Sequence, residues 1–134
     1  MKITGYCCLT VYDEALDFED IKKNLDFEPT DITYKGESNK IGTSPGDVWA
    51  YDVAFEEEDD IDEEINKFVS FIMKYKYYIC HLSKTNNVRL WCDIYAYNAQ
   101  SKIFFSPKTI DTISKLGIGF DIEIYLHEED IEEK

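Results

Sequence analysis

Apolar and polar residues alternate strictly in several stretches of this chain, and this alternation limits its fold more than any other feature. The clearest stretch is 88–97. Its apolar face carries Val88, Leu90, Cys92, Ile94 and Ala96. Its other face carries Arg89, Trp91, Asp93, Tyr95 and Tyr97. Because successive side chains of a strand point to opposite faces, the pattern predicts a strand with one face on a core.

Related patterns elsewhere in the chain predict six further strands. They cover residues 2–12, 32–34, 48–55, 77–83, 102–105 and 118–126. In the first of these, Tyr6 and Tyr12 lie opposite the apolar residues. The polar face of the last carries Asp121, Glu123 and Tyr125. A chain with this many strands needs helices or a second sheet to cover them.

Apolar residues at helical spacing predict three helices. The longest spans about 60–75, and its first turn is rich in acids. Its apolar stripe consists of Ile61, Ile65, Phe68, Val69, Ile72 and Met73. Two shorter helices begin after Asp17 and after Ser106, whose side chains can cap a first turn. Pro29 stops the first short helix and Gly117 ends the second.

The order of these elements predicts an α+β fold, a mostly antiparallel sheet with about three helices packed on one face. Segments 25–27 and 116–118 each lead from a short helix into a strand, and this internal similarity favours two βαβ-like halves. We expect residues 1–134 to form a single domain, because that length suits one hydrophobic core. The acidic tail 128–134 is expected to fray.

Net charge separates the possible function classes. The chain carries 28 acidic and 14 basic residues, a formal charge of −14. This charge repels nucleic acid and anionic membranes and steers the protein toward basic partners. No apolar run is long enough to cross a bilayer, and the first residues do not resemble a secretory signal. We therefore expect a cytoplasmic protein with a basic protein partner, and its oligomeric state stays open.

No pattern of catalytic or cofactor-binding residues accompanies this charge. The four cysteines form no C-x-x-C pair and only two histidines are present, so zinc spacing is absent. The glycine-containing loop 35–46 matches no phosphate-binding motif. We expect no catalytic residues, no metal, no cofactor and no enzymatic activity. The favoured interpretation of the cysteines is buried thiols in a reducing compartment, while a disulfide or a reactive thiol stays open.

A dense run of acids leads into the longest predicted helix. It includes Glu57, Glu58, Asp59, Asp60, Asp62 and Glu63. Such a run is typical of a solvated loop and helix start, because acids in a first turn are stabilised by the helix dipole. An acidic patch that binds a partner is the other interpretation. The spacing matches no calcium-binding loop.

The polar face of the stretch 88–97 is rich in aromatic residues. The side chains expected to gather there, with help from the last strand, are Trp91, Asp93, Tyr95, Tyr97, Asp121 and Glu123. Aromatic rings bury much area at a small entropic cost, so this face can be a recognition surface. It can also be a second buried face or ordinary cross-strand aromatic pairing.

Several short motifs occur in a distinctive order. Phe27-Glu28-Pro29-Thr30, Tyr34-Lys35-Gly36-Glu37, Trp49, Ser106-Pro107, Leu116-Gly117 and the acidic strand 120–125 follow one another. This order resembles a bacterial family known as domain of unknown function 4279, over nearly the whole chain. The resemblance implies no catalytic residues. Small acidic proteins of this kind are similar in size and charge to immunity proteins, which neutralise toxins of neighbouring bacteria.

The main hypothesis is a non-enzymatic, immunity-type inhibitor of a basic toxin, such as a nuclease. Carboxylates of segment 57–63, with Asp121 and Glu123, would pair with lysines and arginines of the toxin. The buried anchors would come from Trp49, Trp91, Tyr95 or Tyr97.

The alternative hypothesis is an intracellular small-ligand sensor. In it, loop 35–46 closes over a pocket beside Trp49, and Arg89 holds an anionic group. A third hypothesis, an enzyme that uses paired carboxylates, would need two acids with raised pKa values in one cleft.

Overall fold

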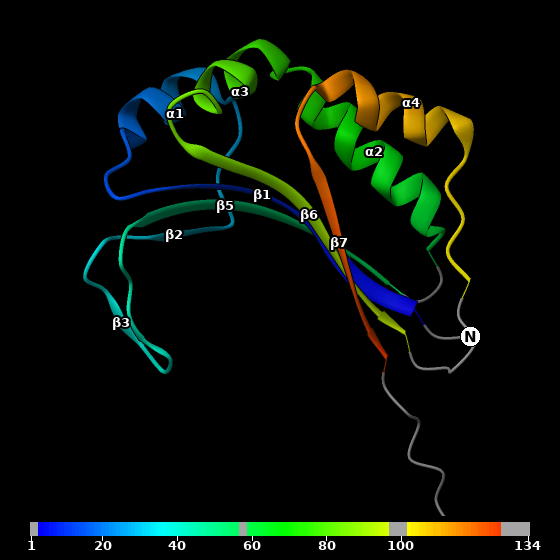
Figure 1. Cartoon of the computed structure of the whole chain (residues 1–134), viewed down its shortest axis with the longest axis horizontal. Coiled ribbons are helices and arrows are strands. Elements are labelled where there is room, and N and C mark those ends of the chain that lie inside the picture. Colours follow the sequence, from blue (N-terminus) through cyan, green and yellow to red (C-terminus); the bar gives the residue numbers. More distant parts are fainter. Residues whose placement is uncertain (1–2, 57–58, 97–101, 127–134) are drawn as a thin grey trace, which may run out of the picture.

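A curved five-stranded sheet carries helices on one side, as the computed structural model of the chain shows (Figure 1). The structure describes residues 3–56, 59–96 and 102–126. Its elements are β1 (Ile3–Asp13), α1 (Phe18–Asn24), β2 (Asp31–Thr33), β3 (Ser38–Asn39), β4 (Gly42–Thr43), β5 (Asp47–Phe55), α2 (Ile61–Met73), α3 (Lys76–Leu82), β6 (Asn87–Ala96), α4 (Pro107–Leu116) and β7 (Phe120–Leu126).

The large sheet has the strand order β2-β5-β1-β6-β7. Every neighbouring pair is antiparallel except β6 and β7, which run parallel. The predicted α+β fold with a mostly antiparallel sheet is therefore confirmed. β6, α4 and β7 form a strand–helix–strand unit with adjacent parallel strands. β1, α1 and β2 form a related unit, in which β5 lies between the two parallel strands.

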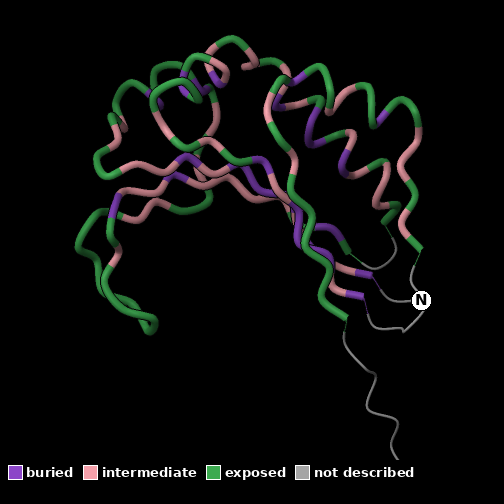
Figure 2. The backbone as a smooth tube through the Cα atoms, viewed as in Figure 1, coloured by how far each residue is buried: buried purple, intermediate pink, exposed green. Residues whose placement is uncertain are grey.

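The helix-covered face of the sheet holds the core. Leu9, Leu90 and Ile94 are fully buried there. The apolar stripe of α2 packs onto this face, and the ring of Phe68 stacks on Tyr51 of β5 at 6.0 Å. Figure 2 shows buried segments along the central strands and on the inner side of α2. Each such side chain contributes about 1.5–3 kcal/mol by leaving water, which makes this face the main source of stability.

Side-chain caps define where the helices begin. The Asp17 carboxylate accepts from the N–H of Asp20, and the Asp60 carboxylate accepts from the N–H of Asp62. Ser106 caps α4 in the same way. Gly117 ends α4 with a φ of 79°, a left-handed conformation that glycine adopts without strain. The predicted starts at Asp17 and Ser106 and the end at Gly117 are confirmed.

The predicted strand at 77–83 is wrong, because these residues belong to α3. The tract begins with two tyrosines and an isoleucine, residue types that favour strands. Its buried side chains nevertheless recur at helical spacing, with Ile79 and Leu82 in the core and Tyr77 90% exposed. Tertiary packing of this stripe outweighs local propensity. The part of the chain that the structure describes therefore has four helices rather than three.

Three further features differ from the prediction. Residues 102–105 form no strand. The N–H of Ser106, which follows them, donates to the Asp62 carboxylate at 2.8 Å. Loop 35–46 contains the small hairpin of β3 and β4. The last strand begins at Phe120, after the αL cap of α4. The tail 128–134 lies outside the described residues.

Candidate functional site

The side of the sheet opposite the helices forms a continuous surface, which we call the open face. Alternation places every second residue of β1, β5, β6 and β7 on it, and the register brings Tyr6 opposite Asp93 and Trp91 opposite Asp121. All four helices of the described chain lie on the other side (Figure 1). The central residues of the open face are Tyr6, Cys8, Thr10, Asp52, Arg89, Trp91, Asp93, Tyr95, Asp121, Glu123 and Tyr125.

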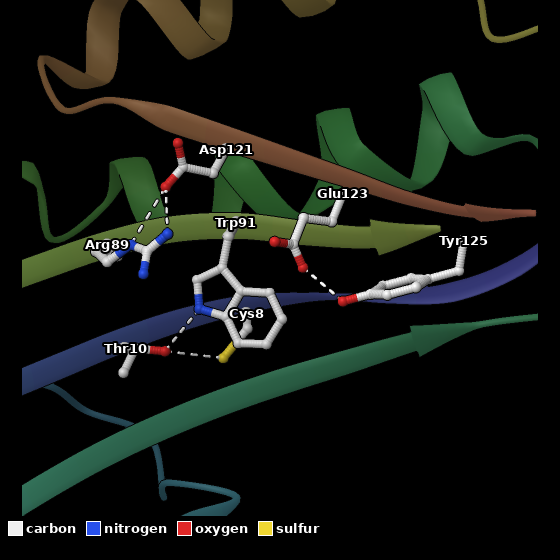
Figure 3. Close-up of polar contacts among 7 residues, drawn as sticks. All are labelled: Cys8, Thr10, Arg89, Trp91, Asp121, Glu123 and Tyr125. Carbon is white, nitrogen blue, oxygen red and sulfur yellow. Dashed lines mark hydrogen bonds and ion pairs between the residues drawn. The ribbon is translucent and has the colours of Figure 1, made fainter. Parts of the chain in front are cut away.

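Hydrogen bonds across strands fix the side chains of the open face (Figure 3). The indole Nε1–H of Trp91 donates to Thr10 Oγ1 at 2.8 Å, and the Cys8 sulfur lies 3.2 Å from the same oxygen. At the edge, Arg89 donates to Asp121 Oδ2 from Nη2 at 2.7 Å and from Nε at 3.2 Å. These bonds link β1, β6 and β7, so the surface is ordered before any partner arrives.

Aromatic contacts add to this order. Tyr6 meets Trp91 edge to face with ring centres 5.5 Å apart, and Tyr95 stacks on Tyr125 at 5.2 Å. Such pairs contribute about 0.5–1.5 kcal/mol each beyond the area they bury. The rings are half-buried or exposed rather than covered by a second layer. They therefore present large, rigid apolar surfaces to the solvent side of the sheet.

Asp93 is the exception among these satisfied groups. It is only 6% exposed, and its Oδ2 accepts from the hydroxyl of Tyr6 at 3.0 Å. Its Oδ1 is buried without a hydrogen-bond partner among the described residues, and the same holds for Asp52 Oδ1. An unsatisfied buried polar group costs about 1–3 kcal/mol, and more when it is charged. Such groups are rare in folded proteins, so each of them calls for an explanation.

Two phenols of the open face, those of Tyr6 and Tyr125, have raised pKa values. Desolvation, aided by the hydrogen bond to Asp93, raises the pKa of Tyr6 well above its usual range. The hydrogen bond from Tyr125 to Glu123 Oε2, 2.6 Å long, raises the pKa of Tyr125 to about 12. Both tyrosines therefore remain hydrogen-bond donors at physiological pH, and the negative charge of the face resides on its carboxylates.

A hollow of about 200 Å³ opens on this face beside Trp91 and Asp93. The side chains of Arg89, Asp121 and Glu123 complete its rim. It contains three carboxylates and one guanidinium, so the surplus charge of its lining is negative.

The structure brings five of the predicted site residues together on the open face. They are Trp91, Asp93, Tyr95, Asp121 and Glu123. Trp49 lies apart from them, because it faces the helices and is 3% exposed in the core. It cannot contact a partner together with Trp91. Glu57, Glu58 and Tyr97 lie outside the described residues.

The described part of the acidic segment, residues 59–63 at the start of α2, lies on the helix side of the sheet and makes local hydrogen bonds. Asp59 accepts from the N–H of Glu56 at 2.7 Å, and Asp60 caps the helix. Asp62 accepts from the N–H of Ser106; desolvation alone would raise its pKa, but hydrogen bonds from Ser106 hold it below the ordinary value. Glu63 is exposed. The structure thus does not join this segment to Asp121 and Glu123.

Three contributors to the open face were not singled out from the sequence. Cys8, Thr10 and Asp52 face the same side as Trp91, and Thr10 holds the indole in place. Their positions follow from the register in which β1 pairs with both β5 and β6. The alternation of each strand is readable from sequence, but the register between strands is not.

Three of the four thiols are packed inside the protein. Cys7, Cys8 and Cys92 are buried, and all four cysteines are free. The Cys7 and Cys92 sulfurs lie 3.8 Å apart, and this contact, with burial, raises the pKa of Cys7 far above its usual range. Burial likewise raises the pKa of Cys8 to about 12. Among the described residues, no group of three His, Cys, Asp or Glu side chains is arranged to hold a metal ion.

A second concavity lies on the other side of the molecule, between α1 and β2. This cleft has a volume of about 480 Å³. Phe18 and Tyr34, in edge-to-face contact at 5.2 Å, lie on its wall with Lys22, and Trp49 borders it from below. None of the lining residues comes from loop 35–46, and Arg89 lies on the opposite face of the sheet.

Comparison with known proteins places the chain in a family. Residues 2–127 match the family described as Domain of unknown function (DUF4279), so the chain belongs to that family. No curated protein and no solved structure matches the chain. Within the described residues, no helix has both the length and the apolar character needed to cross a membrane.

Proposed function

We propose that this member of the DUF4279 family is a non-enzymatic, acidic binding protein. It would act as an immunity-type inhibitor that neutralises a basic bacterial toxin, such as a nuclease, by direct protein–protein interaction. The observation that carries the proposal is the open face, where fixed aromatic rings surround carboxylates and no helix of the described chain covers them. The analogy in size and charge with immunity proteins supports the choice of partner.

The chemistry of the open face suits a protein partner. Interface centres are rich in Trp and Tyr, and their energy is concentrated in a few buried anchors. Trp91 is held by Thr10, and Tyr95 is stacked on Tyr125, so little side-chain entropy is lost when a partner covers them. Trp91 and Tyr95 would therefore be the anchors of the complex.

The charge of the chain suits a basic partner. A net charge of −14 accelerates encounter with a positively charged protein and repels nucleic acid and anionic membranes. Asp121 and Glu123 at the rim would pair with lysines and arginines that in a nuclease hold phosphate groups. The inhibitor would thus block the substrate site of the toxin by pairing with the basic side chains that line it. The proposal places the protein in the cytoplasm, where a toxin that degrades nucleic acid would be met.

Calorimetry with a candidate toxin tests this function directly. The probe is the product of a neighbouring toxin gene, titrated at low and at moderate salt. Glu123→Lys reverses a charge on the open face. Glu63→Lys is the control, because it makes the same change at an exposed position of α2. We expect Glu123→Lys to weaken binding about 30-fold or more, since like charges in an interface cost several kcal/mol. Absence of binding, or equal loss in both variants, would contradict the proposal.

A small-ligand sensor remains the second candidate, because the cleft beside Trp49 favours it. The cleft has a volume of about 480 Å³, within the range of about 300–1,000 Å³ that small-molecule sites occupy. A ligand that binds only the folded protein raises its Tm. A saturable rise in Tm with one compound of a metabolite panel, lost in Tyr34→Ala, would support this function. A flat response across the panel would contradict it.

A further inference from the structure

The hollow is lined by Asp93, a buried carboxylate with one oxygen for which the described chain supplies no donor. Asp93 lines the hollow, and although Tyr6 satisfies its Oδ2, its Oδ1 is buried and unpartnered. The residue is 6% exposed, so solvent around its edge compensates little of this loss. A carboxylate kept in this state on a rigid strand points to a donor that arrives from outside the chain.

The charge of the lining selects a cationic donor. Three carboxylates, those of Asp93, Asp121 and Glu123, face one guanidinium, that of Arg89. Arg89 already donates twice to Asp121 Oδ2 at the rim. The deeper acid therefore has no positive counterpart in the hollow. A neutral guest would leave this charge uncompensated, and an anionic guest would be repelled.

The size of the hollow selects a single side chain rather than a free metabolite. Small-molecule sites usually measure about 300–1,000 Å³. The hollow measures about 200 Å³. That space accepts one long side chain that enters from a surface docked above it. The adjoining rings of Trp91 and Tyr95 offer the flat apolar area on which such a surface could rest.

Between the two basic side chains, the geometry favours arginine. Its planar guanidinium carries five donors in a fixed fork and loses less hydration on burial than an ammonium group. It also stacks on aromatic rings, and Trp91, the best ring type for a cation, lines the hollow with its indole fixed by Thr10. We propose that this hollow is an anchor pocket for one arginine of the basic partner, whose guanidinium pairs with the Asp93 carboxylate. The partner's identity rests on the proposed function; the pocket chemistry does not.

Two indole signals make the pocket observable without the partner. The chain has two tryptophans, and Trp49 lies in the core on the other face of the sheet. The probe is the blocked tripeptide acetyl-Gly-Arg-Gly-amide, titrated into ¹⁵N-labelled protein, with acetyl-Gly-Lys-Gly-amide in parallel. We expect a saturable shift of the Trp91 indole signal with the arginine peptide and a several-fold weaker response with lysine. The Trp49 signal should stay in place. Equal responses to both peptides, or none at Trp91, would overturn the proposal.

Matched variants assign the effect to Asp93. Asp93→Asn keeps the shape and removes the charge, while Glu63→Gln removes one exposed charge far from the pocket. Asp93→Asn should weaken the arginine peptide about tenfold or more, the usual effect of losing a hydrogen bond between charged groups, and Glu63→Gln less than about twofold. An unchanged Trp49 signal shows that the Asn variant is folded. Glu123→Gln changes only the exposed rim of the hollow, and we expect it to weaken binding of the arginine peptide by a smaller factor.

The same variants separate this pocket from the proposed function. If the toxin binds and Asp93→Asn binds it as tightly as Glu63→Gln does, the anchor pocket is wrong and the inhibitor function stands. If the toxin does not bind but the arginine peptide shifts Trp91 in an Asp93-dependent way, the pocket stands and the inhibitor function fails. A tenfold or greater loss with both probes, roughly the effect of one charged hydrogen bond, supports both.

Discussion

The two faces of one strand, β6, are held in place by different interactions. Leu90 and Ile94 point toward the helices and are fully buried among apolar neighbours. Trp91 and Asp93 alternate with them and point to the open face, where hydrogen bonds and ring contacts hold them. Each face is ordered, but only the covered face maximises burial. The comparison teaches that one strand can be ordered on both sides by different means, by burial on the covered face and by hydrogen bonds and ring contacts on the open face.

Asp93 shows the difference between the two faces most clearly. It is nearly as buried as the core residues, yet one of its carboxylate oxygens has no partner in the described chain. A residue selected for stability at this position would be apolar or fully hydrogen-bonded. The covered face should therefore respond to substitution mainly through unfolding. The open face should respond mainly through binding.

The largest effect on stability is expected on the covered face. Leu90→Ala removes a fully buried side chain beneath the helices and leaves a cavity. We expect a loss of about 2–5 kcal/mol in the free energy of unfolding, measured by urea titration. Arg89→Ala, on the next residue, is the control and should change stability by less than about 1 kcal/mol. Similar losses in both would contradict the division between the faces.

An intermediate effect is expected where the open face is tied to the sheet. Thr10→Val keeps the shape of the side chain but removes the acceptor of the Trp91 indole N–H. A half-buried donor left without a partner should lower the free energy of unfolding by about 1–3 kcal/mol. The Trp91 indole signal should also broaden or move, since its ring is no longer fixed. A fully stable variant with an unchanged indole signal would mean that this hydrogen bond contributes nothing.

A small effect is expected at Asp93 despite its burial. Asp93→Asn can still accept from the Tyr6 hydroxyl and no longer buries a charge. The unfolding free energy should stay within about 1 kcal/mol of the original or rise, because burying a neutral group costs less than burying an unpaired charge. A loss comparable to that of Leu90→Ala would show that Asp93 supports the fold and would break the contrast.

The pH dependence of stability should come from acids that hold loops and helices. The N–H groups of Leu16 and Lys35 donate to Asp47 at 2.9 and 2.7 Å and lower the pKa of this carboxyl below 3.8. Because its folded pKa is the lower one, the stabilisation is present above pH 3.8 and is lost as the pH falls through the folded value. Asp47→Asn should flatten the acid limb of a plot of unfolding free energy against pH. An unchanged acid limb would show that Asp47 does not contribute to the pH dependence of stability.

Sequence patterns predicted what depends on one segment at a time. The alternation in β6 gave both of its faces, and the apolar stripe and acidic first turn predicted α2. α3 was missed because its tyrosine-rich tract favours a strand until its neighbours in space are known. The gathering of Trp91, Asp121 and Glu123 could be foreseen from alternation. The unpartnered oxygen of Asp93 could not, since it depends on which residue of β1 stands opposite.

Mapping the bound surface tests the central claim most directly. In a cross-saturation experiment on the labelled chain bound to the proposed toxin, saturation passes only to residues in contact with the partner. The account predicts transfer to the Trp91 indole and to the rings of Tyr95 and Tyr125, with none to Trp49 or the exposed side of α2. Transfer confined to α2 and the other helices, with a silent open face, would contradict it.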